Sequence, residues 1–380
     1  MGRERKQFFD GLPKNLTYEP VKVVKIGDRL VGEGQPVFVI AEVGANHRGK
    51  IENALKLIEL ASEAGADAIK FQHLKHDKIA ADTVVYEEWH GKPVGVFSEF
   101  YKSAEMPFEW TEKLIAHAKK HNIMFLSSPF DKDAVNLLDT AGVPAFKVAS
   151  YELTDDILLR HIARKGKPVI LSTGMAYLEE VAHAVRVIQE EGNNEIVILH
   201  CISIYPPKSF ADLNLHAIGT LREAFKVPVG YSDHSKPPYL AAPIAAVALK
   251  ACVIEKHFTT ERSGGSNDDP NSLEIDEFKR TVEEIRNTEL ALSRAGIKQP
   301  ISDEAHALGM DEIADRWARR SLYATRDIPA GSFLGEDMIT TLRPWGGIAP
   351  KDAGLVIGKK VLRDIKARSP ITWEDFLETK

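Results

Sequence analysis

The sequence predicts an α/β fold, a (β/α)8 (TIM) barrel followed by a small β-rich domain. Eight short runs are apolar nearly throughout, as in parallel strands that are buried on both faces. Most run ends lie about 21 to 31 residues apart, which leaves room for one crossover helix in each interval. The runs are Val37–Val43, Ala68–Gln72, Ile123–Ser128, Ala145–Ser150, Pro168–Thr173, Ile196–Ser203, Pro228–His234 and Cys252–His257.

Seven stretches carry apolar residues at helical spacing, and several open at a cap residue or close before glycine. The predicted helices are Asn53–Ala64, Glu109–His121, Thr154–Arg164, Leu178–Glu191, Leu213–Phe225, Pro238–Lys250 and Ile275–Ala295. In a barrel of this kind the functional side chains lie at the carboxyl ends of the strands. The polar residues that end the runs are therefore expected to meet at one rim.

The interval between the second and third runs is abnormally long. About 35 residues from His73 to Pro107 separate these strands, and several of them are aromatic. A loop of this length at the catalytic end of a barrel is expected to be a lid or a subunit contact, and the sequence leaves both open.

The pattern changes after Gly296, which divides the chain into four predicted parts. These are an N-terminal extension (1–20), the barrel domain (21–296), a linker (297–317) and the small β-rich domain (318–380). Short β runs and tight turns fill the last part. A domain of about 65 residues buries a small core, so docking or dimer packing is expected to support it.

Composition argues for a protein that acts on small molecules in the cytoplasm. The formal net charge of −6 disfavours nucleic acid and anionic membranes as partners. The opening residues lack the apolar core of a signal peptide, and no run of about 18 apolar residues occurs. Cys201 and Cys252 both fall within predicted buried strands, which predicts reduced core thiols.

Two histidines end consecutive predicted strands, His234 and His257. Neighbouring strand ends bring imidazole nitrogens close enough to share one divalent ion. Glu42 ends the first strand, which lies next to the eighth in a closed barrel. Either histidine alone would be expected to fill an ordinary core or surface role, whereas the pair predicts a metal site.

Lys70 and Lys147 lie in the second and fourth runs, and a lysine in such a rim is costly unless it meets an anion. Four serines accompany them near other strand ends, Ser128, Ser150, Ser172 and Ser232. Together they predict a phosphate or carboxylate pocket, although each serine alone is equally consistent with a helix cap. Schiff-base formation is a rival role for either lysine. Three nearby residues are able to hydrogen-bond a polyol, Gln72, Glu152 and Tyr205.

Ordered motifs run through most of the chain. They are FVIAEVGANHRG, GADAIKFQ, FLSSPFD, AFKVASYE, ILSTGM, LHCISIYP, GYSDHS and IEKHFT, followed by RSLYATRDIPAG and RPWGG. This combination resembles the sialic acid (nonulosonic acid) synthase family, and the tail is similar to the antifreeze-like (SAF) domain that ends those enzymes. The likeness covers roughly residues 20–378 and leans toward the pseudaminic acid and spore-coat polysaccharide synthase branches.

The resemblance implies a metal-dependent transferase reaction that condenses phosphoenolpyruvate with an open-chain N-acyl amino sugar. The products would be a nine-carbon 2-keto sugar acid and phosphate. N-acetylmannosamine and a 2,4-diacetamido-trideoxyhexose are both open as the acceptor. The resemblance also implies manganese, with magnesium or cobalt as other ions, held by His234 and His257. It further implies a domain-exchanged homodimer.

Site residues follow from the resemblance by matching motifs. Those expected to hold phosphoenolpyruvate are Lys70, Ser128, Lys147, Ser150, Ser172 and Ser232. Glu42 and Glu152 would lie near the reacting atoms as catalytic residues, together with the two histidines. Those expected to face the sugar are Gln72, Tyr205, Asp268 and, from the tail of a partner subunit, Arg343.

Three departures from the family pattern concern the expected sugar side. Ser203 stands where the family often has Asn, Ser266–Asp268 replaces Gly-Pro-Asp, and Trp345 replaces Gly. Ser203 stays among the expected substrate-binding residues, and the identity of the sugar stays open. A Schiff-base aldolase or lyase and a non-catalytic glycan-binding barrel are the two alternative functions.

Overall fold

The computed structural model describes residues 21–83, 85–89, 92–292, 317 and 319–377. The chain separates into two compact units, Met1–Ser293 and Arg294–Lys380, and each is described by itself. The predicted extension 1–20 and almost all of the predicted linker lie outside the described residues. The exact domain boundaries therefore stay predictions.

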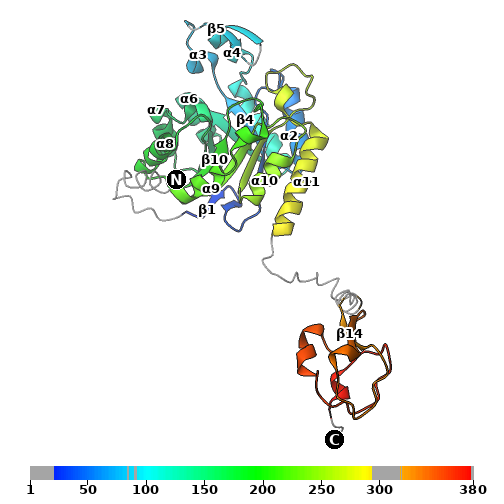
Figure 1. Ribbon diagram of the computed structural model, residues 1–380. Coiled ribbons are helices and arrows are strands. Elements are labelled where there is room, and N and C mark those ends of the chain that lie inside the picture. The colour runs from blue at the N-terminus through cyan, green and yellow to red at the C-terminus, as the bar shows by residue number, and fades with distance from the viewer. Residues whose placement is uncertain (1–20, 84, 90–91, 293–316, 318, 378–380) are drawn as a thin grey trace. The chain divides into compact units, whose positions relative to one another are not determined.

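The first unit is a nearly closed barrel of eight parallel strands (Figure 1). The strands are β3 (Phe38–Glu42), β4 (Ala68–His73), β7 (Met124–Pro129), β8 (Phe146–Val148), β9 (Val169–Ser172), β10 (Ile196–Cys201), β11 (Val229–Asp233) and β12 (Val253–His257). Their order in the sheet is β7-β4-β3-β12-β11-β10-β9-β8. Every predicted run overlaps one of these strands, so the predicted barrel is confirmed.

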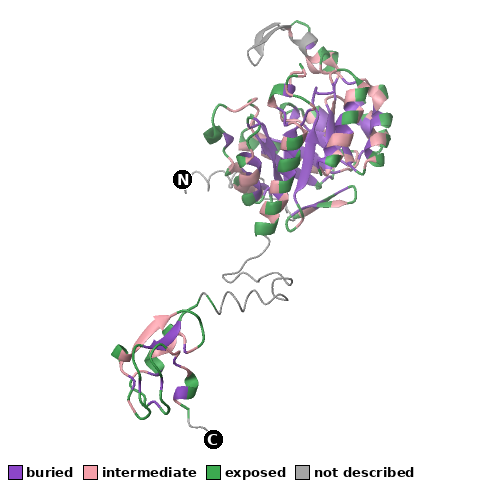
Figure 2. Cartoon of the chain, turned by 90° about the vertical axis from the view of Figure 1, so that its right-hand side faces the viewer, coloured by how far each residue is buried: buried purple, intermediate pink, exposed green. Residues whose placement is uncertain are grey.

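Eight helices cover the outside of the barrel. They are α2 (Ile51–Glu63), α5 (Thr111–Lys120), α6 (Lys132–Thr140), α7 (Asp156–Ala163), α8 (Leu178–Glu190), α9 (Ala217–Phe225), α10 (Ala241–Ala248) and α11 (Ile275–Leu292). Figure 2 shows that the strands are buried and that the helices are exposed on their outer faces. In the described part of the chain, no helix is long and apolar enough to cross a membrane.

Helix α6 is the one barrel helix that the sequence analysis missed. Asp131 caps it, since the carboxylate accepts a hydrogen bond from the backbone N–H of Ala134 at 2.8 Å. Ala134, Val135 and Leu138 are buried and form its inner face. A cap followed by this spacing is a usable signal, but the helix spans only 9 residues.

A β-hairpin closes the amino-terminal end of the barrel, and it was not predicted either. Its strands are β1 (Val23–Ile26) and β2 (Arg29–Gly32), which pair antiparallel. Val24, Ile26 and Val31 pack into the inner core of the barrel with residues such as Phe38 and Leu126. This apolar plug leaves the opposite end, where the strands finish, as the end that is open for chemistry.

The long interval after β4 forms a small substructure above the carboxyl rim (Figure 1). It consists of α3 (His76–Ile79), the antiparallel pair β5 (Val85–Trp89) and β6 (Lys92–Val96), and α4 (Phe97–Lys102). A 3-10 turn at Phe108–Trp110 leads into α5. The position above the rim fits the predicted lid, and the subunit-contact alternative stays open.

The second unit is small and built mainly from turns. Two strands, β13 (Ser321–Ala324) and β14 (Ile339–Leu342), pair antiparallel. Three 3-10 turns complete it, at Glu336–Met338, Pro350–Leu355 and Trp373–Asp375. Its own core contains Leu322, Ile328, Leu334, Ile348, Val356, Val361 and Ile371. The predicted small β-rich domain is thus confirmed as a separate compact body.

Candidate functional site

The strand registers bring the predicted residues together at the carboxyl rim. Glu42 at the end of β3 lies opposite His257 of β12 on one side and Lys70 of β4 on the other. Gln72 of β4 lies opposite Ser128 of β7. Because neighbouring parallel strands end at the same edge, residues from distant parts of the sequence share one site.

Lys70 is buried and held by three strands. Its Nζ lies 2.7 Å from Oε2 of Glu42 and donates to Ser128 Oγ at 3.2 Å. The side-chain N–H of Gln72 donates to the other oxygen of Glu42 at 2.7 Å. A buried ammonium in this position is expensive without anionic partners, and the glutamate supplies one.

Glu255 joins the two lysines, and the sequence analysis did not identify it. Its carboxylate lies 3.7 Å from Lys70 Nζ and 3.5 Å from Lys147 Nζ, and it accepts a hydrogen bond from Ser232 at 3.2 Å. The signal was present, because Glu255 precedes His257 by two residues on one strand and so shares its face. The next residue, Lys256, instead forms a buried pair with Asp233 at 2.8 Å.

Burial and neighbouring charges set the protonation of this network. Burial by itself raises the pKa of Glu255, but Lys147 and Lys70 outweigh it and lower the pKa to about 2. Burial lowers the pKa of Lys147, and Glu255 opposes this only in part. Burial raises the pKa of Glu42 against the attraction of Lys70. The rim therefore combines one ionised carboxylate, that of Glu255, with two groups whose charged forms burial disfavours, Lys147 and Glu42.

Glu152 lies just beyond β8, in the 3-10 turn Ser150–Glu152. Burial raises its pKa to about 8, and Lys147 lowers it only in part. Its Oε2 is buried and has no hydrogen-bond partner among the described residues. A carboxyl group that gains or loses a proton near neutral pH is suited to general acid–base chemistry.

The two predicted metal ligands lie side by side, with ring centroids 5.4 Å apart. His234 uses Nδ1 to donate to the carbonyl of Ile202 at 2.8 Å, which leaves Nε2 for another partner. In the described structure, Nδ1 of His257 is buried and has no hydrogen-bond partner. The ring of Tyr205 packs against His234 with centroids 3.9 Å apart.

Cys201 lies beside this pair, with Sγ 3.7 Å from Nδ1 of His234. Both Cys201 and Cys252 are buried and free of disulfide bonds, as predicted.

Asp268 reaches the rim from the loop after β12. Its Oδ2 accepts a hydrogen bond from the backbone N–H of Ala45 at 2.8 Å. Gly44 makes this approach possible, because it has φ +51° and an added Cβ would lie 2.2 Å from that oxygen. The same Cβ would lie 3.3 Å from Cε1 of His257. Asp268 and His257, the candidate metal ligand, thus both lie close to the turn at Gly44.

A group of hydroxyls lines the part of the rim between β8 and β10. Ser150 Oγ accepts a hydrogen bond from the backbone N–H of Gly174 at 3.0 Å. A Cβ on Gly174 would lie 2.0 Å from Ser203 Oγ, so this glycine lets the two serines approach. Ser172 Oγ is buried without a hydrogen-bond partner among the described residues. The sequence analysis did not identify Gly174 as part of the site.

Arg343 lies in the second unit, directly after β14, and is exposed. Because each unit is described by itself, its approach to any barrel rim stays a prediction. All the other predicted site residues belong to the barrel unit and lie in its strands or in the loops that follow them.

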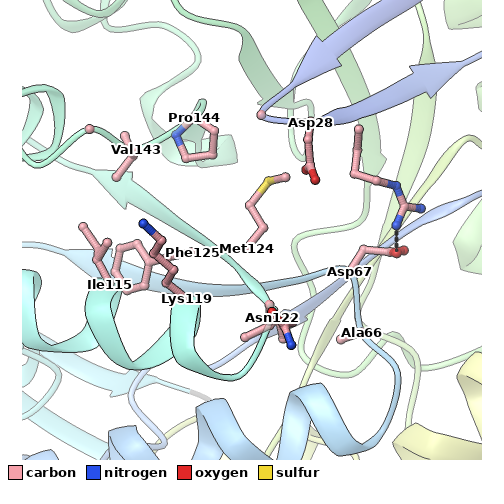
Figure 3. A pocket seen from close by; sticks show the side chains of 14 residues that line it. Asp28, Ala66, Asp67, Ile115, Lys119, Asn122, Met124, Phe125, Val143 and Pro144 are labelled. Atoms are coloured by element: carbon pink, nitrogen blue, oxygen red, sulfur yellow. Dashed lines mark ion pairs between the residues drawn. The ribbon is translucent and has the colours of Figure 1, made fainter.

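A cavity of about 490 Å³ lies at the other end of the barrel (Figure 3). The β1–β2 turn, the amino ends of β4 and β7, and the end of α5 line it. Asp67 there forms an ion pair with Arg29 at 2.7 Å. No residue predicted for the site lines this cavity, and it lacks the buried lysines and glutamates of the rim. We therefore place the chemistry at the carboxyl rim.

The fold and the rim together define a class. A (β/α)8 barrel with buried lysines, glutamates and paired histidines at its strand ends has the residues of an enzyme that acts on an anionic small molecule. Residues 57–296 match the NeuB family and residues 319–377 match the SAF domain. The chain belongs to the NeuB family and carries a C-terminal SAF domain.

Relatives cover nearly the whole chain. The pseudaminic acid synthase of Campylobacter jejuni serotype O:2 is 39% identical over 90% of this chain and 96% of its own. The crystal structure of spore coat polysaccharide biosynthesis protein SpsE from Bacillus subtilis has a TM-score of 0.63 at 37% identity, covering 94% of this chain and 100% of that one. The N-acetylneuraminic acid synthetase of Leptospira borgpetersenii, solved with citrate, has a TM-score of 0.67 at 33% identity, covering 77% and 97%.

Proposed function

We propose that this protein condenses phosphoenolpyruvate with an N-acyl amino sugar to give a nine-carbon 2-keto sugar acid and phosphate. Its membership of the NeuB family and the named activities of its relatives support the reaction class. The observation that carries the proposal is the pair of buried lysines at one rim, Lys70 and Lys147, which share the single carboxylate Glu255. Glu42 also pairs with Lys70, at 2.7 Å, so Lys147 is the less compensated cation and can meet an anionic substrate.

Phosphoenolpyruvate binding is assigned to the lysines and the surrounding hydroxyls. Ser172 supports this assignment, since its buried hydroxyl has no protein partner in the described structure. Ser128 and Ser232 already contact Lys70 and Glu255 and can turn toward substrate oxygens. Ser150, with the neighbouring backbone N–H of Gly174, supplies further hydrogen bonds on the same side. A phosphate and a carboxylate are thereby held by fixed groups that need little rearrangement.

His234 and His257 would hold a divalent ion. The residues fit, because one ring keeps Nε2 available and the other has an unpartnered buried nitrogen. Manganese is the expected ion, with magnesium and cobalt as alternatives. Such an ion, when bound, polarises the aldehyde of the open-chain sugar. The protein residues orient that aldehyde toward C3 of phosphoenolpyruvate.

The reaction balances as a carbon–carbon bond formation followed by hydrolysis. C3 of phosphoenolpyruvate attacks the aldehyde carbon, whose oxygen takes up a proton, and positive charge develops at C2. Water adds to C2 and gives up a proton, and the C2–O bond to phosphate then breaks to leave the ketone. Glu42 or Glu152 accepts the proton of the water, since both carboxyl groups are buried near the lysines.

The residues assigned to the sugar are Gln72, Ser203, Tyr205 and Asp268. Arg343 would reach it from the tail of a partner subunit in a domain-exchanged homodimer. The long segment after β4 would cover the bound sugar and keep bulk water from the developing charge. Serine and asparagine offer different hydrogen-bonding groups. Ser203 therefore favours an amino sugar whose polar groups differ from those that an asparagine would bind.

One observation favours a second function, a Schiff-base lyase that runs in the pyruvate-releasing direction. Burial lowers the pKa of Lys147, which is the change that a nucleophilic lysine requires. Borohydride added during turnover separates the two, since it traps a lysine–substrate adduct covalently in a lyase. We expect the synthase to remain unmodified by mass spectrometry of the intact protein.

The test of the proposed function is phosphate release from phosphoenolpyruvate with a panel of N-acyl hexosamines and diacetamido sugars. At least one acceptor should give stoichiometric phosphate and a product heavier than that sugar by the mass of pyruvate. Lys147→Ala is the comparison variant, and with the same acceptor at low phosphoenolpyruvate it should release phosphate roughly 10- to 150-fold more slowly. No phosphate with any sugar in the panel would contradict the proposal for the sugars tested, and covalent trapping would favour the lyase.

A further inference from the structure

The outer wall of the barrel carries a second group of metal-ligating side chains, far from the rim. Glu59 of α2, His117 of α5 and His121, the residue directly after α5, each offer one ligand atom, and these atoms all lie within 4.8 Å of one another. His117 Nε2 lies 3.2 Å from Oε1 of Glu59, and the two imidazole rings have centroids 4.6 Å apart. His121 precedes the amino end of β7 by only three residues, so the group lies toward the plugged end of the barrel.

The backbone already holds the three side chains in one place. His121 caps the carboxyl end of α5 about one turn after His117, and this brings the two rings together. Ser62 of α2 donates its hydroxyl to the backbone carbonyl of His121 at 2.6 Å, which ties the end of α5 to α2. Leu57 and Leu114 anchor the two helices in the same core.

Lys56 engages only one of the two carboxylate oxygens of Glu59, which leaves the other for a cation. All three side chains are half-buried, so an ion can reach them from water. Lys56 lies 3.1 Å from Oε2 of Glu59 and engages one carboxylate oxygen, while the other faces His117.

We propose that Glu59, His117 and His121 form a zinc site that links α2 to α5. Two imidazole nitrogens and one carboxylate oxygen suit zinc, and a water molecule would complete four-coordination. Bonds of about 2.1 Å place tetrahedral ligand atoms about 3.4 Å apart, so atoms that now lie up to 4.8 Å apart have to approach by at most about 1.4 Å. Half-exposed side chains can make that change by rotamer adjustment. The site is structural, since it touches none of the rim residues.

The test is the zinc content of the full-length protein after dialysis against micromolar zinc. Wild type should hold one zinc ion per chain more than His121→Gln and one more than Glu59→Gln. His183→Gln is the matched control, because His183 is an exposed histidine that pairs with a carboxylate, Asp156, without a second histidine. The rim residues are intact in all four proteins, so binding there cancels in the comparison.

A second readout covers folding. In excess chelator all four proteins should unfold at the same temperature, which shows that the substitutions leave the fold intact. Added zinc should raise the unfolding temperature of wild type and of His183→Gln more than that of the other two variants. Equal zinc content and equal shifts in all four proteins would overturn the proposal and leave a hydrogen-bonded surface cluster. Glu59 lies on α2 and His121 directly follows α5. Damage to one helix would therefore not explain a loss of zinc in both variants.

Discussion

Lys70 and Lys147 owe their unusual setting to the residues around them. Each ammonium is buried, and Glu255 lies between them at 3.7 and 3.5 Å. Glu42 adds a second carboxylate on the side of Lys70 only. The two lysines are therefore not equivalent, because Lys147 has less compensation and its pKa is lowered while that of Lys70 is raised. A bound anion would relieve this imbalance at Lys147 in particular.

Removing either lysine cation should weaken the binding and turnover of phosphoenolpyruvate. A charge-assisted contact of this kind is worth about 1.5 to 3 kcal/mol, so Lys70→Ala and Lys147→Ala should each lose roughly 10- to 150-fold in kcat/KM for phosphoenolpyruvate. Steady-state kinetics at saturating sugar measures the change. Lys165→Ala, on the outer surface, is the control and should stay at wild-type level. Unchanged kinetics in both rim variants would place the anion elsewhere.

Glu152 should make stability depend on pH. Its pKa in the folded protein is about 8, above the ordinary value of 4.5, so the folded state holds the proton more tightly. The stabilisation is complete below the ordinary pKa and is lost as pH rises toward 8. The free energy of unfolding of Glu152→Gln, taken relative to wild type, should therefore rise by roughly 1 to 4 kcal/mol from pH 5 to pH 8.

Urea unfolding at the two pH values measures this difference. Glu179→Gln, which changes an exposed carboxyl on α8, is the matched control and should show no such gain. A difference between wild type and Glu152→Gln that stays constant from pH 5 to pH 8 would contradict the assigned pKa.

Sequence reasoning located the rim residues because strand ends in a barrel share one edge. It missed Glu255 and Gly174, which are recognised only through their neighbours. Glu255 acts between two lysines that arise from other strands, and Gly174 matters because Ser150 and Ser203 close in on it. Such roles depend on side-chain distances across the barrel, which residue spacing along one chain does not give.

At the scale of elements, β11 and β12 position the two proposed metal ligands, His234 and His257. Their parallel pairing sets the histidines side by side, and the bond from His234 to the carbonyl of Ile202 fixes one ring. The turn at Gly44 brings Asp268 close to His257 from a third direction. The proposed metal site thus depends on the ends of two strands and on the turn at Gly44 rather than on one motif.

Chelation should abolish turnover, and manganese or magnesium should restore it. His234→Ala and His257→Ala should each lose most activity while circular dichroism stays unchanged, because the barrel core does not depend on either ring. Glu59→Gln is the control for the surface group and should keep the full response to chelator. Full activity in excess chelator would remove the metal from the reaction.

The elements that the sequence failed to predict share a physical reason. Helix α6 is short, and its apolar face has only a few residues to give a periodic signal. The β1–β2 hairpin has strands of 4 residues each, too short for alternation to stand out. Both are stabilised by tertiary packing, against the barrel wall and the inner core respectively. Long periodic helices and nearly continuous apolar strands were predicted correctly because their own sequence fixes their period.

At the scale of the molecule, the barrel and the SAF domain are separate bodies with separate cores. The exposed Arg343 follows β14 in the smaller body. A linker of about 20 residues is long enough for the tail to serve another subunit. Domain exchange would place that arginine in the partner's sugar site.

Mixing two inactive variants tests this exchange. In a heterodimer of Arg343→Ala with Lys70→Ala, exchange puts both defects in one site and leaves the other intact. Activity should therefore rise well above that of both parents after mixing, with native mass spectrometry to confirm the heterodimer. Arg326→Ala, which changes an exposed arginine of the same domain, replaces Arg343→Ala in the control. No rise would mean that Arg343 serves its own chain or no site.

The central claim is that phosphate leaves from C2 of phosphoenolpyruvate after condensation with the sugar. Phosphoenolpyruvate labelled with oxygen-18 in the bridging position tests it directly, with an amino sugar that supports phosphate release. Because the C2–O bond is the one that breaks, the label should appear in the released phosphate, as mass spectrometry would show. Label that stays with the carbon product, or release that does not depend on the sugar, would contradict this account.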